Sequence, residues 1–347
     1  EGGPARAAAL LRVVECRFAR DPAGARPLAA EVLATGLEGG ASRSVVVACR
    51  LMAGACDVLL GDVDGGLAVL ESGRAEADEV GDPVLVADAY NLMSNVMIHA
   101  GRADAGADVA MRGLQRVREL GVDHGLGPPM AGNATSGLFL AGRWDEAAAL
   151  LAERAGHGGG NAWLLLLQAR LLAHRGDRDA AVRTLAEAED LGAVHDPRWR
   201  AIAIGVALLR GDHGAAHRLA FEALDDDAPR QAAQANDLVA WSVRALADTA
   251  TTGELSVEEA RSAADVLVDR LRTDGAVGTV YVLPRERVAR AERARLGDAP
   301  PVEPWRDALA AWARVGWPHP VAYCRYRLAE ALVADGAEDE PAELLAE

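Results

Sequence analysis

The stretch that decides the fold of this chain is Tyr90-Asn-Leu-Met93-Ser94-Asn-Val-Met97-Ile-His-Ala-Gly101-Arg-Ala-Asp-Ala-Gly106. Its apolar residues recur at helical spacing up to Gly101, and a second apolar-periodic segment follows that glycine. Glycine ends a helix readily because it adopts the left-handed backbone conformation without a steric penalty. The stretch therefore predicts two helices joined by a tight turn.

The same turn recurs along the chain, which indicates a repeat protein. A glycine followed by a polar residue separates two apolar-periodic segments at five places, with spacings of 40, 41, 34 and 35 residues. These turn glycines are Gly61, Gly101, Gly142, Gly176 and Gly211. Each unit is therefore predicted to be a helix–turn–helix. Residues 4–36 are predicted to form one more helix pair before these units.

The repeat also predicts how its helices pack. The positions three and five residues before the turn glycine carry no charge in any unit, so the first helix is apolar on more than one side and lies between neighbours. The position five residues after the glycine is small in every unit, as a close helix–helix contact requires. That position holds Gly66, Gly106, Ala147, Ala181 and Ala216.

Proline marks the expected boundaries between units. Breaks of this kind stand at Asp82-Pro83, Pro128-Pro129, Asp196-Pro197 and Ala228-Pro229. Proline suits the first turn of a helix, where its missing N–H has no partner to lose. We therefore expect a new helix to begin at each of these breaks.

These residues resemble the tetratricopeptide repeat. Tyr90, Met93, Ser94, Met97 and Gly106 match the large, large, small, large and small positions of that family, although its first-helix aromatic position is not aromatic in the other units. No strand pattern is convincing, so the expected fold is all-α, a right-handed α-solenoid. We expect a helix pair over residues 1–42, repeats over 43–227 and irregular helices over 228–347. The helices expected in the last part are 231–249, 256–273, 284–296, 303–315 and 319–335.

A second resemblance lies in residues 305–336. The arrangement of Trp305, Trp312, Gly316, Pro318 and Tyr323 looks like the last repeats of the large ATP-binding regulators of the LuxR family. The resemblance implies a nucleotide-binding module before this region and a helix-turn-helix DNA-binding domain after it. Because the chain starts at Glu1 and stops within a helical segment, we expect it to be a piece of such a protein.

Composition excludes several classes of function. The chain has 36 basic and 52 acidic residues, a net charge of −16, and every basic residue is arginine. Without lysine there is no Schiff-base enzyme, phosphate-loop NTPase or protein kinase. The negative charge also disfavours direct binding of nucleic acid. Four cysteines without a CxxC pair and no apolar run long enough to span a bilayer predict a cytoplasmic, non-membrane protein.

No cluster predicts catalysis, a metal or a cofactor. The glycine-rich stretch 156–160 follows a helix and lacks phosphate ligands, so it reads as a turn between repeats. His213 and His217 have an i,i+4 metal-binding spacing but no third ligand nearby in the sequence. His99 and His174 each stand two residues before a turn glycine, where they read as helix-end residues. We therefore expect a protein that is not an enzyme.

The candidate binding residues are Asn91, Asn95, Ser136 and Arg170. Asn95, Ser136 and Arg170 each lie six residues before a turn glycine, and Asn91 lies one helical turn from Asn95. The resemblance places such positions on a concave groove, where amides and an arginine suit a peptide carboxylate or a small acidic ligand. The alternative is a solvated wall without a ligand.

The expected function follows from these features. The chain reads as the ligand- or partner-sensing arm of a LuxR-type transcriptional regulator, which relays a signal to modules outside it. The alternative is a free-standing tetratricopeptide-like scaffold that binds a protein or peptide partner.

Overall fold

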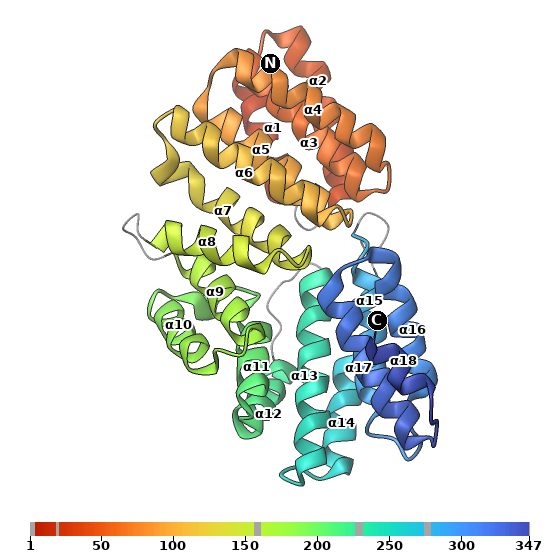
Figure 1. Ribbon diagram of the computed structural model, residues 1–347. Coiled ribbons are helices and arrows are strands. Elements are labelled where there is room, and N and C mark those ends of the chain that lie inside the picture. The colour runs from red at the N-terminus through yellow and green to blue at the C-terminus, as the bar shows by residue number, and fades with distance from the viewer. Residues whose placement is uncertain (1–3, 19–20, 156–160, 226–231, 274–278, 347) are drawn as a thin grey trace. The chain divides into compact units, whose positions relative to one another are not determined.

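The computed structural model describes residues 4–18, 21–155, 161–225, 232–273 and 279–346. Within these ranges the chain forms eighteen α-helices and two short 3-10 helices, and no strand occurs (Figure 1). The all-α prediction is therefore confirmed. The chain divides into two compact units, residues 1–158 with 277–279 and residues 159–276 with 280–347. None of the described helices is long and apolar enough to cross a membrane.

The described residues of the first unit form eight helices, and each one packs against the next in the sequence. Helices α1, α3, α5 and α7 also pack against one another in that order, as first helices of adjacent repeats do. The helices are α1 (Pro4–Phe18), α2 (Pro22–Gly39), α3 (Arg43–Leu59), α4 (Val63–Val80), α5 (Pro83–His99), α6 (Ala103–Glu119), α7 (Asp123–Leu140) and α8 (Trp144–Ala155).

The repeat register predicted from the glycines is present in the packing. All five turn glycines have a positive φ, between 80° and 106°. A Cβ atom on Gly66 of α4 would lie 2.6 Å from the Gly54 carbonyl oxygen of α3. A Cβ atom on Gly106 of α6 would lie 2.9 Å from the Ser94 carbonyl oxygen of α5. The small residue after each turn therefore lets the two helices of a pair approach closely.

One predicted boundary between units is wrong. Pro128 and Pro129 lie inside α7, which begins at Asp123. The two prolines remove only the helical hydrogen bonds to the carbonyls of His124 and Gly125, and both of these residues are exposed to water. Left-handed glycines end the second helices instead, with φ of 72° at both Gly81 and Gly121. Proline does start α5 and lies just ahead of α11, and Pro229 lies outside the described residues.

The second unit contains the remaining helices. After α12 the simple pairing changes, because α13 packs more extensively on α15 than on α14, its neighbour in sequence. All five helices expected over 231–335 are present. The helices are α9 (Ala162–His174), α10 (Arg178–Asp190), α11 (Trp199–Arg210), α12 (His213–Glu222), α13 (Ala232–Thr252), α14 (Val257–Val268), α15 (Val282–Ala294), α16 (Val302–Val315), α17 (Pro318–Ala334) and α18 (Glu340–Ala346).

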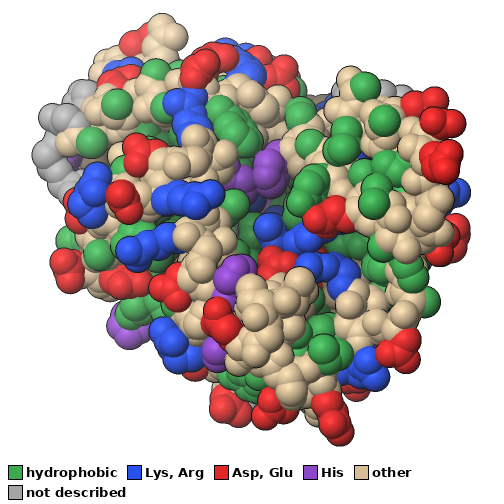
Figure 2. Space-filling view, turned by 60° about the horizontal axis from the view of Figure 1, so that its bottom comes forward, with side chains coloured by type: hydrophobic (Ala, Val, Ile, Leu, Met, Phe, Trp, Pro, Cys, Tyr) green, Lys and Arg blue, Asp and Glu red, His purple; other side chains and the backbone are tan. Residues whose placement is uncertain are grey.

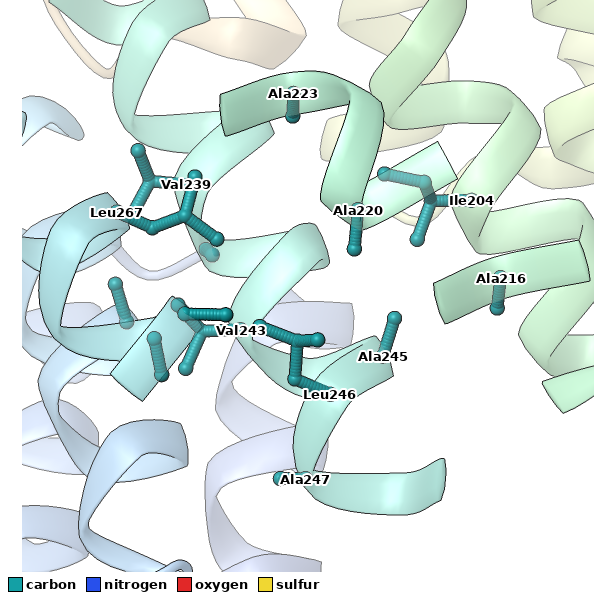
Figure 3. Close-up of a cluster of buried hydrophobic side chains, with 14 of the residues drawn as sticks. Ile204, Ala216, Ala220, Ala223, Val239, Val243, Ala245, Leu246, Ala247 and Leu267 are labelled. Atoms are coloured by element: carbon teal, nitrogen blue, oxygen red, sulfur yellow. The ribbon is translucent and has the colours of Figure 1, made fainter. Parts of the chain in front are cut away.

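An alanine-rich core joins α11 and α12 to α13, α14 and α15. Ile204 of α11 and Ala216 of α12 belong to this core, and Ala216 occupies the small position five residues after the turn glycine Gly211 (Figure 3). Val243 and Leu246 of α13 and Leu267 of α14 complete its centre. The long helix α13 therefore connects the repeat-like helices to the irregular ones.

Candidate ligand-binding hollow

Three helices of the second unit border a hollow, which we call the α9–α11–α13 hollow. It is shallow: its 260 Å³ of non-atom space includes open solvent, and the enclosed part has room for about one water molecule. Arginine, histidine and acidic side chains lie together in a hollowed part of the surface (Figure 2). The lining residues are Arg170, Ala173 and His174 from α9, Ala201, Ile202, Gly205, Val206 and Leu209 from α11, and Asp237 and Trp241 from α13.

Helical spacing places the polar residues of this hollow. Arg170 and His174 are four residues apart on α9, and Asp237 and Trp241 are four apart on α13, so each pair shares one helix face. Gly205 of α11 faces the indole of Trp241, and a Cβ atom there would meet the ring at an ordinary contact distance of 3.4 Å.

The imidazole of His174 has a defined tautomer. Its Nδ1 lies 2.8 Å from the Arg170 carbonyl oxygen, which can only accept a hydrogen bond. Nδ1 must therefore carry the proton, so Nε2 of the neutral ring is an acceptor. The His174 ring meets that of His319 on α17 edge-on, with centroids 4.5 Å apart. His174 is the last residue of α9, as the sequence predicted for a helix-end residue, and it also lines the hollow.

Burial and positive charge keep both histidines neutral. Burial, and then the neighbouring His319 and Arg170, lower the pKa of His174 to about 3. Burial, with Arg170 and Arg244, lowers the pKa of His319 to about 4. The pKa of Arg170 is itself lowered by burial, against the effect of Asp237. At neutral pH the site thus combines a cationic Arg170 with two uncharged imidazoles.

Asp237 on the opposite wall is anchored to α15. Its carboxylate forms an ion pair of 3.2 Å with Nε of Arg285. Arg285 also donates to the Ala233 carbonyl oxygen at 2.8 Å and lies over the ring of Tyr281. The carboxylate is therefore held in place by a charge from the neighbouring helix.

A buried network of charged residues adjoins the hollow through Arg244. The Arg244 guanidinium lies 5.2 Å from the ring centroid of Trp241 and 4.5 Å from that of Tyr323. Asp248, one turn further along α13, forms ion pairs of 2.7 Å with Arg295 and 3.0 Å with Arg327. The network thus ties α13 to α15 and α17.

The centre of this network is almost inaccessible to water. The side chain of Glu292 is 0% exposed, and it accepts hydrogen bonds from Arg295 at 2.7 Å and from the hydroxyl of Tyr323. Burial would raise the pKa of Asp248, but Arg295, Arg327 and Arg244 outweigh it and the pKa is lowered. Burial also raises the pKa of Tyr323, so the phenol stays protonated and donates. This cluster is satisfied internally and holds the helices that back the hollow.

The four residues predicted from the sequence fall in different places. Asn91, Asn95 and Ser136 belong to the first compact unit and Arg170 to the second. Asn91 takes part in a helix–helix contact, because Nδ2 of Asn133 on α7 donates to its side-chain oxygen at 2.9 Å and to Oγ of Ser94 at 3.1 Å. Asn95 and Ser136 are half-buried on α5 and α7. Arg170 lines the α9–α11–α13 hollow.

The sequence pattern missed Asp237, Trp241 and His319. The i,i+4 pair of Asp237 and Trp241 was a usable signal, since it repeats the spacing of Arg170 and His174. His319 had no signal, because only the packing of α17 brings it to α9. Asn133 was missed for the same reason, because its place in the repeat gives no indication of a contact with α5.

The remaining candidates from the sequence are the histidines of α12 and the cysteines. Nδ1 of both His213 and His217 is buried without a hydrogen-bond partner, and among the described residues no group of three or more potential metal ligands occurs. Cys49, Cys56 and Cys324 are buried free thiols, and burial raises the pKa of Cys49 to about 11. Residues 156–160 lie outside the described residues. Neither a family model nor a curated protein matches this chain.

Proposed function

We propose that this chain is a non-catalytic helical-repeat domain that senses a ligand or partner. The observation that carries the proposal is the α9–α11–α13 hollow, which Arg170, His174 and Trp241 line together. A concave, mostly apolar space with a few polar groups is what small-molecule sites have in common.

In its finer form, the proposal is that the domain is the sensor arm of a LuxR-type transcriptional regulator. Support comes from the resemblance in residues 305–336, whose Trp305 and Trp312 are buried between α16 and its neighbours. In such a protein the domain would pass its bound state to an ATP-binding module and a DNA-binding module. The alternative remains a scaffold that binds a protein or peptide.

The complete reading frame distinguishes these two forms. A phosphate-loop module upstream and a helix-turn-helix domain downstream are expected for the regulator, and neither is expected for the scaffold. The isolated chain should not be retained on duplex DNA, because its net charge of −16 opposes binding to phosphates. Tight, salt-sensitive retention would contradict the assignment of DNA contact to another domain.

Partner capture tests the sensing role. A partner isolated from the source cell with the full chain should be titrated against Asn95→Ala and Arg170→Ala separately, because the two residues belong to different units. The proposal predicts at least a tenfold loss of affinity, about 1.4 kcal/mol, for one of them. If both variants bind the partner with wild-type affinity, the binding site does not include these two residues.

A further inference from the structure

We propose that His213 and His217 of α12 form a two-histidine site for a divalent transition-metal ion, Cu²⁺ or Zn²⁺, with water in the remaining coordination positions. The inference goes beyond the proposed function and does not rest on it. It is argued from the place of the two rings on the helix, their common orientation, and the backbone and charges around them.

The first argument is where the two histidines stand on α12. They are four residues apart, so their side chains leave the same side of the helix about 6 Å apart along its axis. Ala216 and Ala220 mark the face of α12 that packs into the core, and both are 0% exposed (Figure 3). The histidines stand beside this face and are half-buried. Each ring therefore has one edge against the protein and another toward solvent.

The second argument is that both rings are turned the same way. In each histidine Nδ1 is buried and has no hydrogen-bond partner. The nitrogen further from the backbone, Nε2, is the one left on the solvent side of each half-buried ring. Two imidazole nitrogens on one side of a helix, one turn apart, can bind one metal ion together. Imidazole is a ligand that suits copper, nickel and zinc.

The buried Nδ1 atoms also predict the strength of the site. A metal ion bound at Nε2 places the proton of the neutral ring on Nδ1, and a histidine ligand usually donates this N–H to a neighbouring acceptor. Neither His213 nor His217 has such an acceptor. The site should therefore bind its metal reversibly, and more weakly than a structural zinc site does.

The third argument is that the first turn of α12 is held in place. The carboxylate of Asp212 caps the helix by accepting a hydrogen bond from the Ala215 N–H at 2.9 Å. The hydroxyl of Thr249 on α13 lies 3.3 Å from the His213 carbonyl oxygen, to which it donates. Ligands on a fixed backbone need less ordering when the metal binds.

The charges near His213 favour a cation. The N-terminal end of a helix by itself disfavours positive charge. Carboxylate oxygens of Asp212 and Glu254, however, lie 3.8 Å and 3.9 Å from where a Cβ atom of Gly214 would stand. The guanidinium of Arg218 lies 3.5 Å from the same point. Two carboxylates against one guanidinium leave a local negative charge, which attracts a divalent ion.

Calorimetry with single metal ions tests the chemistry on the full chain. Cu²⁺ should bind more tightly than Zn²⁺, as nitrogen ligands prefer, and Mg²⁺, which prefers oxygen ligands, should not bind. Cu²⁺ is also paramagnetic, so it should broaden the NMR signals of the two α12 imidazoles before those of the other histidines. Absence of Cu²⁺ binding, or broadening that begins at other histidines, would overturn the proposal.

Variants test whether both rings hold the same ion. His213→Gln and His217→Gln should each weaken Cu²⁺ binding at least tenfold, because either one leaves a single imidazole. The double variant should be only slightly weaker than either single variant, because the shared site is already lost. Wild-type affinity in either single variant would overturn the two-histidine site.

Two other histidines supply matched controls. His319→Gln interrupts the other close pair of imidazoles in this unit, and His195→Gln removes an exposed one. Both variants should bind Cu²⁺ as the wild type does. If His319→Gln weakens binding and the α12 variants do not, the metal binds at the other pair and the proposal is wrong.

Discussion

Two groups of helices are held together by different kinds of contact. The first group is α3 to α6, and the second is α13, α15 and α17. In the first group, glycines such as Gly54 and Gly66 let the helix backbones approach closely. Its ion pairs lie nearer the surface: the side chains of Arg74 and Asp78 are 23% and 28% exposed. In the second group the contact is charged and buried, with Glu292 0% and Asp248 15% exposed.

The difference teaches what each contact tolerates. A helix contact made by small residues has no room for a larger side chain, but weakening it leaves no buried charge without a partner. A buried ionic contact depends on all its members, because removal of one leaves the others charged and without water. We therefore expect the second group to be the more sensitive to polar substitutions and the first to changes in side-chain volume.

The largest effect is expected at Glu292. Glu292→Ala leaves Arg295 without one of its two carboxylates and Tyr323 without its acceptor, so the free energy of unfolding should fall by about 3–5 kcal/mol. Urea unfolding followed by tryptophan fluorescence measures it, because six of the seven tryptophans belong to the second unit. Glu330→Ala, with a 45% exposed carboxylate, is the control and should cost less than about 1 kcal/mol.

Overpacking the repeat contact comes next. Ala147→Leu in α8 and Ala181→Leu in α10 place a large side chain where the residue is 0% exposed, and each should cost about 1–3 kcal/mol. Ala149→Leu and Ala186→Leu, on exposed faces of the same helices, are the matched controls. Equal melting temperatures for the buried and exposed substitutions would contradict the repeat register.

Acid should weaken the second unit before the first. The unfolded chain protonates His174 and His319 near pH 6.5, whereas burial in the folded chain lowers their pKa values to about 3 and about 4, respectively. The unfolded state therefore binds more protons in this window, and stability falls as pH decreases from 6.5 to 4.5, by about 1 kcal/mol per pH unit for each histidine.

Chemical denaturation at several pH values, read by tryptophan fluorescence, checks this dependence. His174→Gln and His319→Gln should flatten the profile, and His195→Gln, at an exposed position, should not. A wild-type profile that is flat between pH 6.5 and 4.5 would contradict the neutral state assigned to both imidazoles.

The smallest effect is expected at the surface of the first unit. Arg43 and Glu79 form an ion pair between α3 and α4 whose side chains are 58% and 64% exposed. Because water screens such a pair, Glu79→Ala should change the free energy of unfolding by no more than about 0.5 kcal/mol. A loss of several kcal/mol would mean that surface ion pairs matter more in this unit than glycine contacts do.

The sequence by itself determined the helices and their turns. The spacing of Gly61, Gly101 and Gly142 predicted where helices end, and the small residues after them predicted which faces touch, because both depend on local backbone geometry and residue volume. The boundary expected at Pro128 was wrong, because a helix tolerates proline where the carbonyls that lose a hydrogen bond are exposed.

Only the tertiary structure decided which polar residues meet. Asp248 and Arg327 are 79 residues apart in the sequence, and the partners of Arg170 come from helices that no repeat period relates to α9. Helical periodicity states which face of a helix a residue occupies, but not which helix packs on that face. Which helix packs there depends on the packing of whole helices. For this reason Asn91 lies in a contact between α5 and α7, whereas Arg170 lines a hollow.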